Sequence, residues 1–277
     1  MSIKKWVYIL DNEEKIWLTE GQCHFLESEI SEVQTKATEQ EMAGRDGVLV
    51  GPNTFGPFEL KLNFYFNGTD GEDLLAFTEK IKRIVHVRQP RYVVHSDLPG
   101  RKYAFNTANI EWEKITSADA NFSITFNCYK GYSESLTDTS SKIYRNSTWQ
   151  YENGLKADKD ILYTHHNWAF DIWNGSTDYI NPVLHHNIKI VVNANAPNGL
   201  TIENETTGDI FEYKEPLKYK DELLIDGVHP FLNKKQRVGK YTNYEWITLA
   251  PGYNRIHIYG NKLSKIKTQW IFNFIYR

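Results

Sequence analysis

Alternation of apolar and polar residues is the dominant pattern in this chain, and it predicts many short β-strands. In the first half, apolar side chains occupy every second position over residues 60–66 and 122–128. In the second half, the same period recurs over residues 188–192, 256–258 and 270–276. A period of two places one set of side chains on a core face and the other on the opposite face. Residues 270–276 are apolar on nearly both sides, which predicts a central strand or one at an interface.

One segment has the spacing of an amphipathic helix. Thr69 or Asp70 is a suitable N-cap, because a short polar side chain there accepts from the first free amides. Apolar residues then follow at helical spacing, namely Leu74, Phe77, Ile81, Ile84 and Val85. We expect the helix to end near His86 and an i,i+4 ion pair to join Glu79 to Arg83. One helix among many strands predicts a sheet with a helix packed on one face.

Glycine and polar residues mark the connections between these elements. Residues 28–41 are polar with widely spaced apolar positions, and we interpret them as an irregular arm or loop. Gly44, Gly47 and Gly51 predict a tight connection that follows the arm. Asn198-Gly199 is typical of a β-hairpin turn.

The chain is long enough for two domains. Residues 131–141 are polar and offer little to bury, and they separate two strand-rich halves. We therefore predict an N-terminal domain over residues 1–132, a linker over 133–150 and a C-terminal domain over 151–277.

Composition excludes several classes of protein. The two cysteines, Cys23 and Cys128, provide neither a disulfide framework nor a zinc-binding spacing. Residues 1–14 contain no apolar signal core, and no run approaches the roughly 20 apolar residues that a membrane span needs, so no membrane insertion is expected. A net charge of -3 argues against a general nucleic-acid binder.

Charge is unevenly distributed along the chain. Residues 1–130 carry 15 basic and 19 acidic side chains, and ten of those acids lie between Asp11 and Asp46. A solvated surface is the ordinary interpretation of such a run. A deliberately negative functional face is the alternative.

Motifs of catalysis and metal binding find no support. His165-His166 and His185-His186 are adjacent pairs, and neighbours on a strand point to opposite faces, so neither pair is suited to chelate one ion. The chain has no G-x-S-x-G, phosphate-loop or H-E-x-x-H motif. We expect no enzyme activity, no cofactor and no metal.

Aromatic residues make up 14% of the chain, and several tryptophans lie in its second half. Aromatic faces stack on sugars, so a carbohydrate-binding module for cell-wall polysaccharide is an alternative function. Its candidate stacking residues are Trp168, Trp173 and Trp246. Alternating aromatics in strands belong more often to a core or an interface.

Four segments in this order resemble the distal tail proteins of siphophages that infect Gram-positive bacteria. The first joins Gly44-Arg45-Asp46-Gly47 to the aromatic strand at residues 58–66, and the second is the helix leading into Pro90-Arg91-Tyr92. The third is Leu98-Pro99-Gly100-Arg101-Lys102-Tyr103 with the strands that follow it. The fourth is Leu249-Ala250-Pro251-Gly252-Tyr253-Asn254-Arg255-Ile256, followed by an aromatic final strand.

The resemblance implies a mainly β protein with a tail-tube-like N-terminal β-sandwich, one packed α-helix and a galectin-like C-terminal β-sandwich. It also implies a homohexameric ring at the end of a phage tail, assembled in the host bacterial cytoplasm. The ring would join the tail tube protein to the tail-associated hub protein and to receptor-binding or baseplate proteins, and DNA would pass through it. A related tail-tube or other baseplate protein is a further alternative.

Two sets of residues receive roles under this resemblance. We expect the ring contact to involve the loop with Arg45 and Asp46 and the strand with Leu60, Leu62, Phe64 and Phe66. A channel for DNA should repel phosphate, so we expect early acids to line it. The candidates are Glu27, Glu29, Glu32, Glu39 and Glu41.

Overall fold

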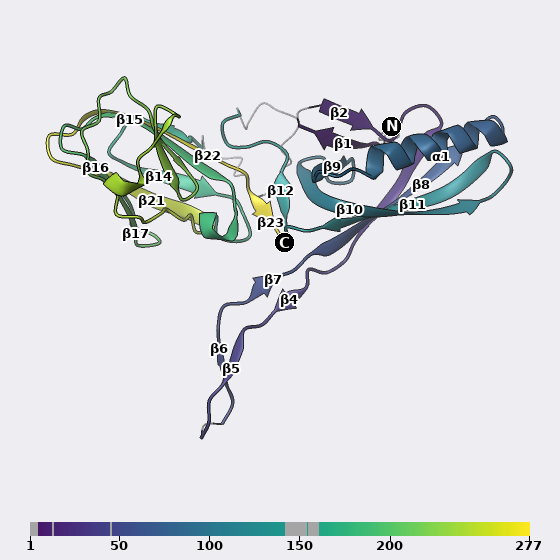
Figure 1. Ribbon diagram of the computed structural model, residues 1–277, viewed down its shortest axis with the longest axis horizontal. Helices are drawn as coiled ribbons and strands as arrows, with labels where there is room; N and C mark the ends of the chain where they lie inside the picture. Colours follow the sequence, from purple (N-terminus) through teal and green to yellow (C-terminus); the bar gives the residue numbers. More distant parts are fainter. Residues whose placement is uncertain (1–4, 13, 45, 142–153, 155–160) are drawn as a thin grey trace. The chain divides into compact units, whose positions relative to one another are not determined.

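The computed structural model describes residues 5–12, 14–44, 46–141, 154 and 161–277. The chain divides into two compact units, residues 1–134 together with Arg277, and residues 135–276. Strands dominate both units, as the alternation predicts, and Figure 1 shows the order of the elements. None of the helices in the described ranges has the length and apolarity needed to cross a bilayer.

The sheet of the first unit has seven strands along its main path, in the order β2-β1-β9-β10-β11-β8-β3. Neighbours along this path are antiparallel. Their bounds are β1 Val7–Asp11, β2 Glu14–Trp17, β3 Cys23–Ile30, β8 Phe58–Asn67, β9 Arg91–His95, β10 Arg101–Lys114 and β11 Asp119–Cys128.

This sheet curls so that both of its halves enclose one core. Strands β3 and β9 are four places apart along the path, yet the rings of Phe25 and His95 lie 6.0 Å apart. The Ser28 hydroxyl also donates to Asp97 Oδ2 at 2.9 Å, just beyond β9. The first unit therefore encloses its core with one continuous hydrogen-bonded sheet instead of two separate stacked sheets.

The predicted helix is confirmed. Helix α1 spans Gly71–Val85, Asp70 accepts from the amides of Glu72 and Asp73 as N-cap, and His86 is the C-cap. The expected Glu79–Arg83 pair is wrong, because Lys82 Nζ lies 2.8 Å from Glu79 Oε1 and Arg83 Nε donates to the Glu79 backbone carbonyl. Residues three and four positions after Glu79 both lie on its side of the helix, and here the partner at i+3, Lys82, forms the ion pair.

Stacked aromatic rings join α1 to the sheet. The Phe77 ring lies parallel to that of Phe66 with centroids 4.1 Å apart, and it meets the edge of Phe122 at 5.7 Å. Phe122 stacks in turn on Phe64 at 4.8 Å and on Trp112 at 4.5 Å. The helix thus covers the core face of β8 and β11 and leaves their other face uncovered by it.

The polar segment after β3 is an arm of paired strands rather than an irregular loop. Its two short ladders pair β4 with β7 and β5 with β6 (Figure 1). All residues of these four strands are exposed. The bounds are β4 Thr35–Lys36, β5 Glu39–Glu41, β6 Val48–Val50 and β7 Thr54–Phe55. Gly44 and Gly47 have φ near +80°, which suits the tight turn at the tip.

The second unit consists of two antiparallel sheets. One has the order β13-β22-β15-β18-β19-β20 and the other β14-β21-β16-β17. The strands are β13 Thr164–His165, β14 Ala169–Asn174, β15 Ile188–Asn195, β16 Leu200–Asn204, β17 Asp209–Tyr213, β18 Leu223–Asp226, β19 His229–Leu232, β20 Gln236–Arg237, β21 Gly252–Tyr259 and β22 Ser264–Phe272. Two 3-10 turns, η2 Pro182–Leu184 and η3 Gly239–Tyr241, interrupt the connections, and β23 spans Ile275–Tyr276.

Buried side chains of both sheets meet in one core. Phe170 on β14 and Trp270 on β22 contact edge to face at 6.2 Å, and Trp270 is completely buried. The predicted Asn198-Gly199 hairpin is wrong, because β15 and β16, on either side of it, belong to different sheets. Gly199 still has φ of +79°, and a Cβ there would lie 2.1 Å from the carbonyl oxygen of Tyr213. Glycine is required by that close approach, not by a hairpin.

Part of the predicted linker is ordered and buried. Strand β12, Ser133–Ser135, lies where the first unit passes into the second, and its three residues are buried. Hydroxyl groups in this segment bond to nearby backbone; for example, Thr139 Oγ1 donates to the Trp270 carbonyl at 2.7 Å. Hydrogen bonds of this kind offset the cost of burying these hydroxyl groups. Residues 142–150 of the predicted linker lie outside the described residues.

Candidate functional site

The most distinctive surface of the first unit is the face of β3, β8, β11 and β10 that α1 does not cover. Registers across these four strands place directly opposed side chains in rows on that face. The three central rows are Glu27–Asn63–Ser123–Glu111, Glu29–Lys61–Thr125–Asn109 and His24–Tyr65–Asn121–Glu113. Glu59, Asn67, Asp119, Asn127 and Thr107 continue the same face toward the strand ends. We call this surface the acidic face.

Charge on the acidic face is one-sided. Its rows contain six carboxylates, from Glu27, Glu29, Glu59, Glu111, Glu113 and Asp119, against the single lysine Lys61. Most of the carboxylates lie on the outer strands β3 and β10. The inner strands β8 and β11 present mainly amides and hydroxyls. The result is a negative surface with a neutral, hydrogen-bonding middle.

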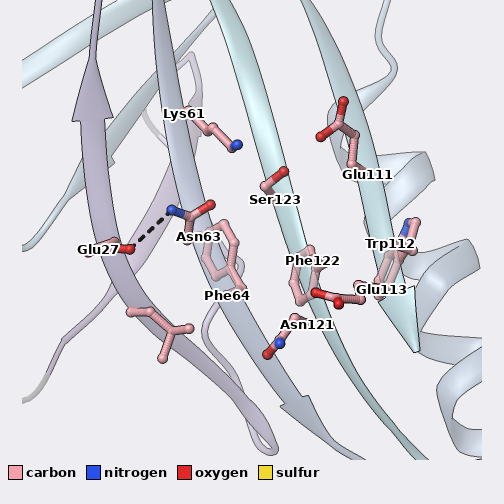
Figure 2. Close-up of a pocket in the computed structure, with 11 residues that line it drawn as sticks. Glu27, Lys61, Asn63, Phe64, Glu111, Trp112, Glu113, Asn121, Phe122 and Ser123 are labelled. Carbon is pink, nitrogen blue, oxygen red and sulfur yellow. Dashed lines mark hydrogen bonds between the residues drawn. The ribbon is translucent and has the colours of Figure 1, made fainter. Parts of the chain in front are cut away.

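Asn63 links the two acids of β3. Its amide nitrogen donates to Glu29 Oε1 at 2.9 Å and reaches Glu27 Oε1 at 3.4 Å. Figure 2 shows Asn63 pointing toward Glu27, with Glu111 and Glu113 on the far strand. Between these strands lies a hollow of about 510 Å³, whose lining includes Glu27, Glu111, Glu113 and the amides of Asn63 and Asn121.

A bulge explains why the β3 acids point to this face. The pairing of β3 with β8 shifts between Phe25 and Glu27, so Leu26 is an extra residue. Phe25 therefore stays in the core opposite Phe64, while Glu27 and Glu29 both point outward opposite Asn63 and Lys61. Without the shift, these glutamates would fall on the core face.

The predicted channel residues divide into two groups. Glu27 and Glu29 lie on the acidic face, whereas Glu32, Glu39 and Glu41 are exposed on the arm or its approach. The sequence analysis missed Glu111 and Glu113, which belong to a strand paired in register with β11. Their alternation with Ile110 and Trp112 indicates a strand with these glutamates on its polar face. Only the pairing of β10 with β11, β11 with β8 and β8 with β3 places them on the same face as the β3 acids.

The predicted ring residues also divide. Leu60, Leu62, Phe64 and Phe66 are at most 3% exposed, so their side chains fill the core of their own domain. A neighbour cannot touch them in this conformation, and any contact through β8 would involve the alternate residues. The second face of this strand is largely polar, because it carries Lys61, Asn63 and Tyr65. Asp46 is exposed at the arm tip, and Arg45 lies outside the described residues.

The arm carries a group of exposed apolar side chains. Val50 is 71% exposed, Leu49 50%, Met42 43% and Val48 42%. The three residues of β6 pair with the polar residues Glu39, Gln40 and Glu41 of β5, and Met42 directly follows β5. Apolar groups this exposed on a two-stranded ribbon are typical of a surface that a partner covers.

The three candidate sugar-stacking tryptophans do not share one strand face. Trp173 on β14 points to the exposed side, where its ring meets the edge of Tyr253 at 4.8 Å and its Nε1 donates to the Gly154 carbonyl. Trp168 lies just before β14 at an even-numbered position, whereas Trp173 is odd-numbered, so alternation along the strand does not place them on the same face. Trp246 lies in the irregular segment before β21. Their sugar-binding role stays a prediction.

The paired histidines lie in unrelated places. His165 stacks on Phe170 at 4.1 Å, and His186 Nδ1 lies 2.9 Å from the Tyr179 carbonyl. Within the described ranges, no three potential ligands among histidine, cysteine, aspartate and glutamate come together as a metal site would require.

Comparison with known proteins agrees with this architecture. Residues 16–128 match the family model described as phage tail protein RIFT-related domain. No curated protein sequence matches the chain significantly. Among solved structures, the Dit protein of phage SPP1, described as a paradigm of the hub adsorption apparatus in phages that infect Gram-positive bacteria, superposes with a TM-score of 0.66. That match covers 98% of this chain and 99% of the SPP1 protein at 13% identity.

A chain in the activated phage P2 baseplate with calcium gives a TM-score of 0.46 at 12% identity, with 98% of both chains covered. The fold over the whole chain is that of SPP1 Dit, and the expected resemblance to phage tail proteins is confirmed. Residues 16–128 of this chain match the phage tail protein RIFT-related domain, and the chain over nearly its whole length has the fold of SPP1 Dit.

Proposed function

We propose that this chain forms a homohexameric ring at the distal end of a siphophage tail and that DNA passes through the ring along the acidic face. In this proposal the ring joins the tail tube protein to the tail-associated hub protein and to receptor-binding or baseplate proteins. Its place is the virion tail, after assembly in the host cytoplasm. The acidic face is the observation that carries the proposal, because six carboxylates against one lysine repel phosphate and leave passing DNA unbound.

Two unlike strand edges support a head-to-tail ring. Strand β3 ends the sheet on one side. On the other side, β9 pairs with β10 only as far as Phe105, so positions 107–114 of β10 extend beyond it. Pairing between unlike edges of neighbouring subunits is heterologous, and a heterologous contact produces a ring when the rotation between subunits closes. Such pairing would extend the acidic face from one subunit to the next.

The arm supplies a second candidate contact. Burying Val48, Leu49 and Val50 on a neighbouring subunit would remove three consecutive exposed apolar side chains from water. In this arrangement each subunit extends its arm over the next.

Light scattering tests the ring. The wild-type protein should have six times the mass of one chain, and V50D should lose that mass because a charge would be buried at the contact. V183D is the matched control, since Val183 is also exposed, at 49%, but lies in the second unit. A monomeric wild type, or a V50D ring as stable as the wild type, would contradict the proposal for the arm.

Charge reversal tests the channel. Rings with Glu27, Glu29, Glu111 and Glu113 all changed to lysine should bind a short fluorescent duplex that wild-type rings do not bind. As a control, Glu203, Glu205, Glu212 and Glu215 of the second unit are changed to lysine. This ring has the same net charge as the first variant, but its added lysines lie away from the acidic face. Equal DNA binding by both variants would show that the acidic face does not line the passage.

A further inference from the structure

The root of the arm is held by few interactions of its own. We define the arm root as residues 34–36 and 54–56, where Thr35 pairs with Phe55 and the Gly56 amide donates to the Gln34 carbonyl at 2.7 Å. An isolated two-stranded ribbon is marginal in water. The direction of the arm therefore depends on what else contacts its root.

A turn from elsewhere in the first unit packs directly against this root. Gly131 has φ of +70°, and a Cβ at this position would lie 2.8 Å from the Gly56 carbonyl oxygen and 3.1 Å from that of Phe55. Backbone thus meets backbone with no room for a side chain. Glycine is needed at 131 both for its dihedral angle and for this approach.

Buried charge fixes the turn that carries Gly131. Lys130 Nζ lies 2.8 Å from Glu134 Oε1 and donates to the Tyr92 hydroxyl at 2.9 Å. The two charged side chains are only 16% and 3% exposed, so the ion pair is hardly screened by water. The ion pair therefore restrains the turn that packs against the arm root.

A cation also contacts the root. The guanidinium carbon of Arg277 lies 4.0 Å from the centroid of the Phe55 ring, well within cation–π range. Arg277 belongs to the first unit although it is far from Phe55 in sequence. Phe55 itself is 40% exposed, so this contact covers only part of the ring.

We propose that the Gly131 turn and the guanidinium of Arg277 together fix the arm root and so set the direction in which the arm leaves the sheet. Its consequence for assembly rests on the proposed function, in which the arm contacts a neighbouring subunit. The fixing of the root itself is independent of that function.

Hydrogen exchange at the Gly56 amide tests the proposal. R277A and F55L should each accelerate exchange of this amide about two- to fivefold, as loss of one partly exposed cation–π contact predicts. The double variant should exchange no faster than the faster single variant, because either change removes the same interaction. R88A, which removes an exposed arginine of the same unit, should leave the rate unchanged.

G131A should have a larger effect, about tenfold or more, since alanine is strained at this dihedral angle and meets the Gly56 carbonyl. Should G131A fail to fold, the arginine and phenylalanine variants still decide. Unchanged exchange in both R277A and F55L, or purely additive effects in the double variant, would overturn the proposal. A wild-type protein that forms no ring would instead defeat the proposed function and leave the exchange result standing.

Discussion

Removing the Phe77 ring should weaken the packing of α1 on the sheet and so lower the free energy of unfolding of the first unit. The ring is 9% exposed, stacks on Phe66 at 4.1 Å and meets Phe122 edge on. Replacing a buried phenylalanine by alanine costs about 3–5 kcal/mol. Alanine recovers roughly 0.5 kcal/mol through its higher helix propensity. We therefore expect F77A to lose about 3 kcal/mol of the free energy of unfolding.

Native-state hydrogen exchange measures this loss separately for each unit. Slow amides of β8 and β11 report global opening of the first unit, so about 3 kcal/mol should accelerate them roughly a hundredfold. Amides of β15 and β22 in the second unit give an internal reference and should not change.

Leu75 provides the matched control on the same helix. It is 65% exposed, so L75A should change the free energy of unfolding by less than about 0.5 kcal/mol. If F77A accelerates β8 and β11 amides no more than L75A does, α1 does not cover the core, and the assignment of the opposite face as the open one fails with it.

Three further predictions concern buried titratable groups. His95 is completely buried, and burial lowers its pKa to about 4. The unfolded chain takes up a proton at this residue below about pH 6.5, so the free energy of unfolding of the first unit should fall by about 2 kcal/mol between pH 7.5 and 5. Urea titrations of H95F should show no such fall. Burial raises the pKa of Cys23 and Cys128 to about 12, so neither thiol should react with a thiol reagent at pH 8 until urea unfolds the first unit; labelling of the native protein would contradict this. E134A should cost about 3 kcal/mol, because it leaves the buried Lys130 without a carboxylate to balance its charge. The double variant K130M/E134L should cost less than E134A alone, and a double variant as unstable as E134A would refute this account of the pair.

Sequence patterns predicted an element correctly where interactions between residues close together in the chain determine it. The cap at Asp70 and the apolar spacing from Leu74 to Val85 place α1 correctly, because capping and amphipathicity are both local. Alternation likewise locates β8, β11 and β15. The segment from Trp270 to Tyr276 is one pattern in sequence but two strands in the structure, β22 and β23.

Pairing between distant strands was not accessible from these patterns. Glu111 and Glu113 join the acidic face only through the register of β10 with β11, and Glu27 reaches it only through the bulge at Leu26. The buried state of Ser133–Ser135 likewise depends on backbone partners that polarity alone does not reveal. The run of acids between Asp11 and Asp46 suggested channel-lining candidates, but the charge pattern alone could not separate Glu27, on the sheet, from Glu39, on the arm.

Strand β8 serves two surfaces at once, and this limits how the chain can change in length. Its even-numbered residues fill the core and its odd-numbered residues form the middle of the acidic face. Deleting one residue within Phe58–Asn67 would exchange the two sets beyond the deletion and place Lys61 or Asn63 at core positions that leucine or phenylalanine now fills. The turn at the arm tip has exposed residues on both sides and no such constraint. Related chains should therefore vary in length at residues 42–47 and keep β8 free of insertions and deletions.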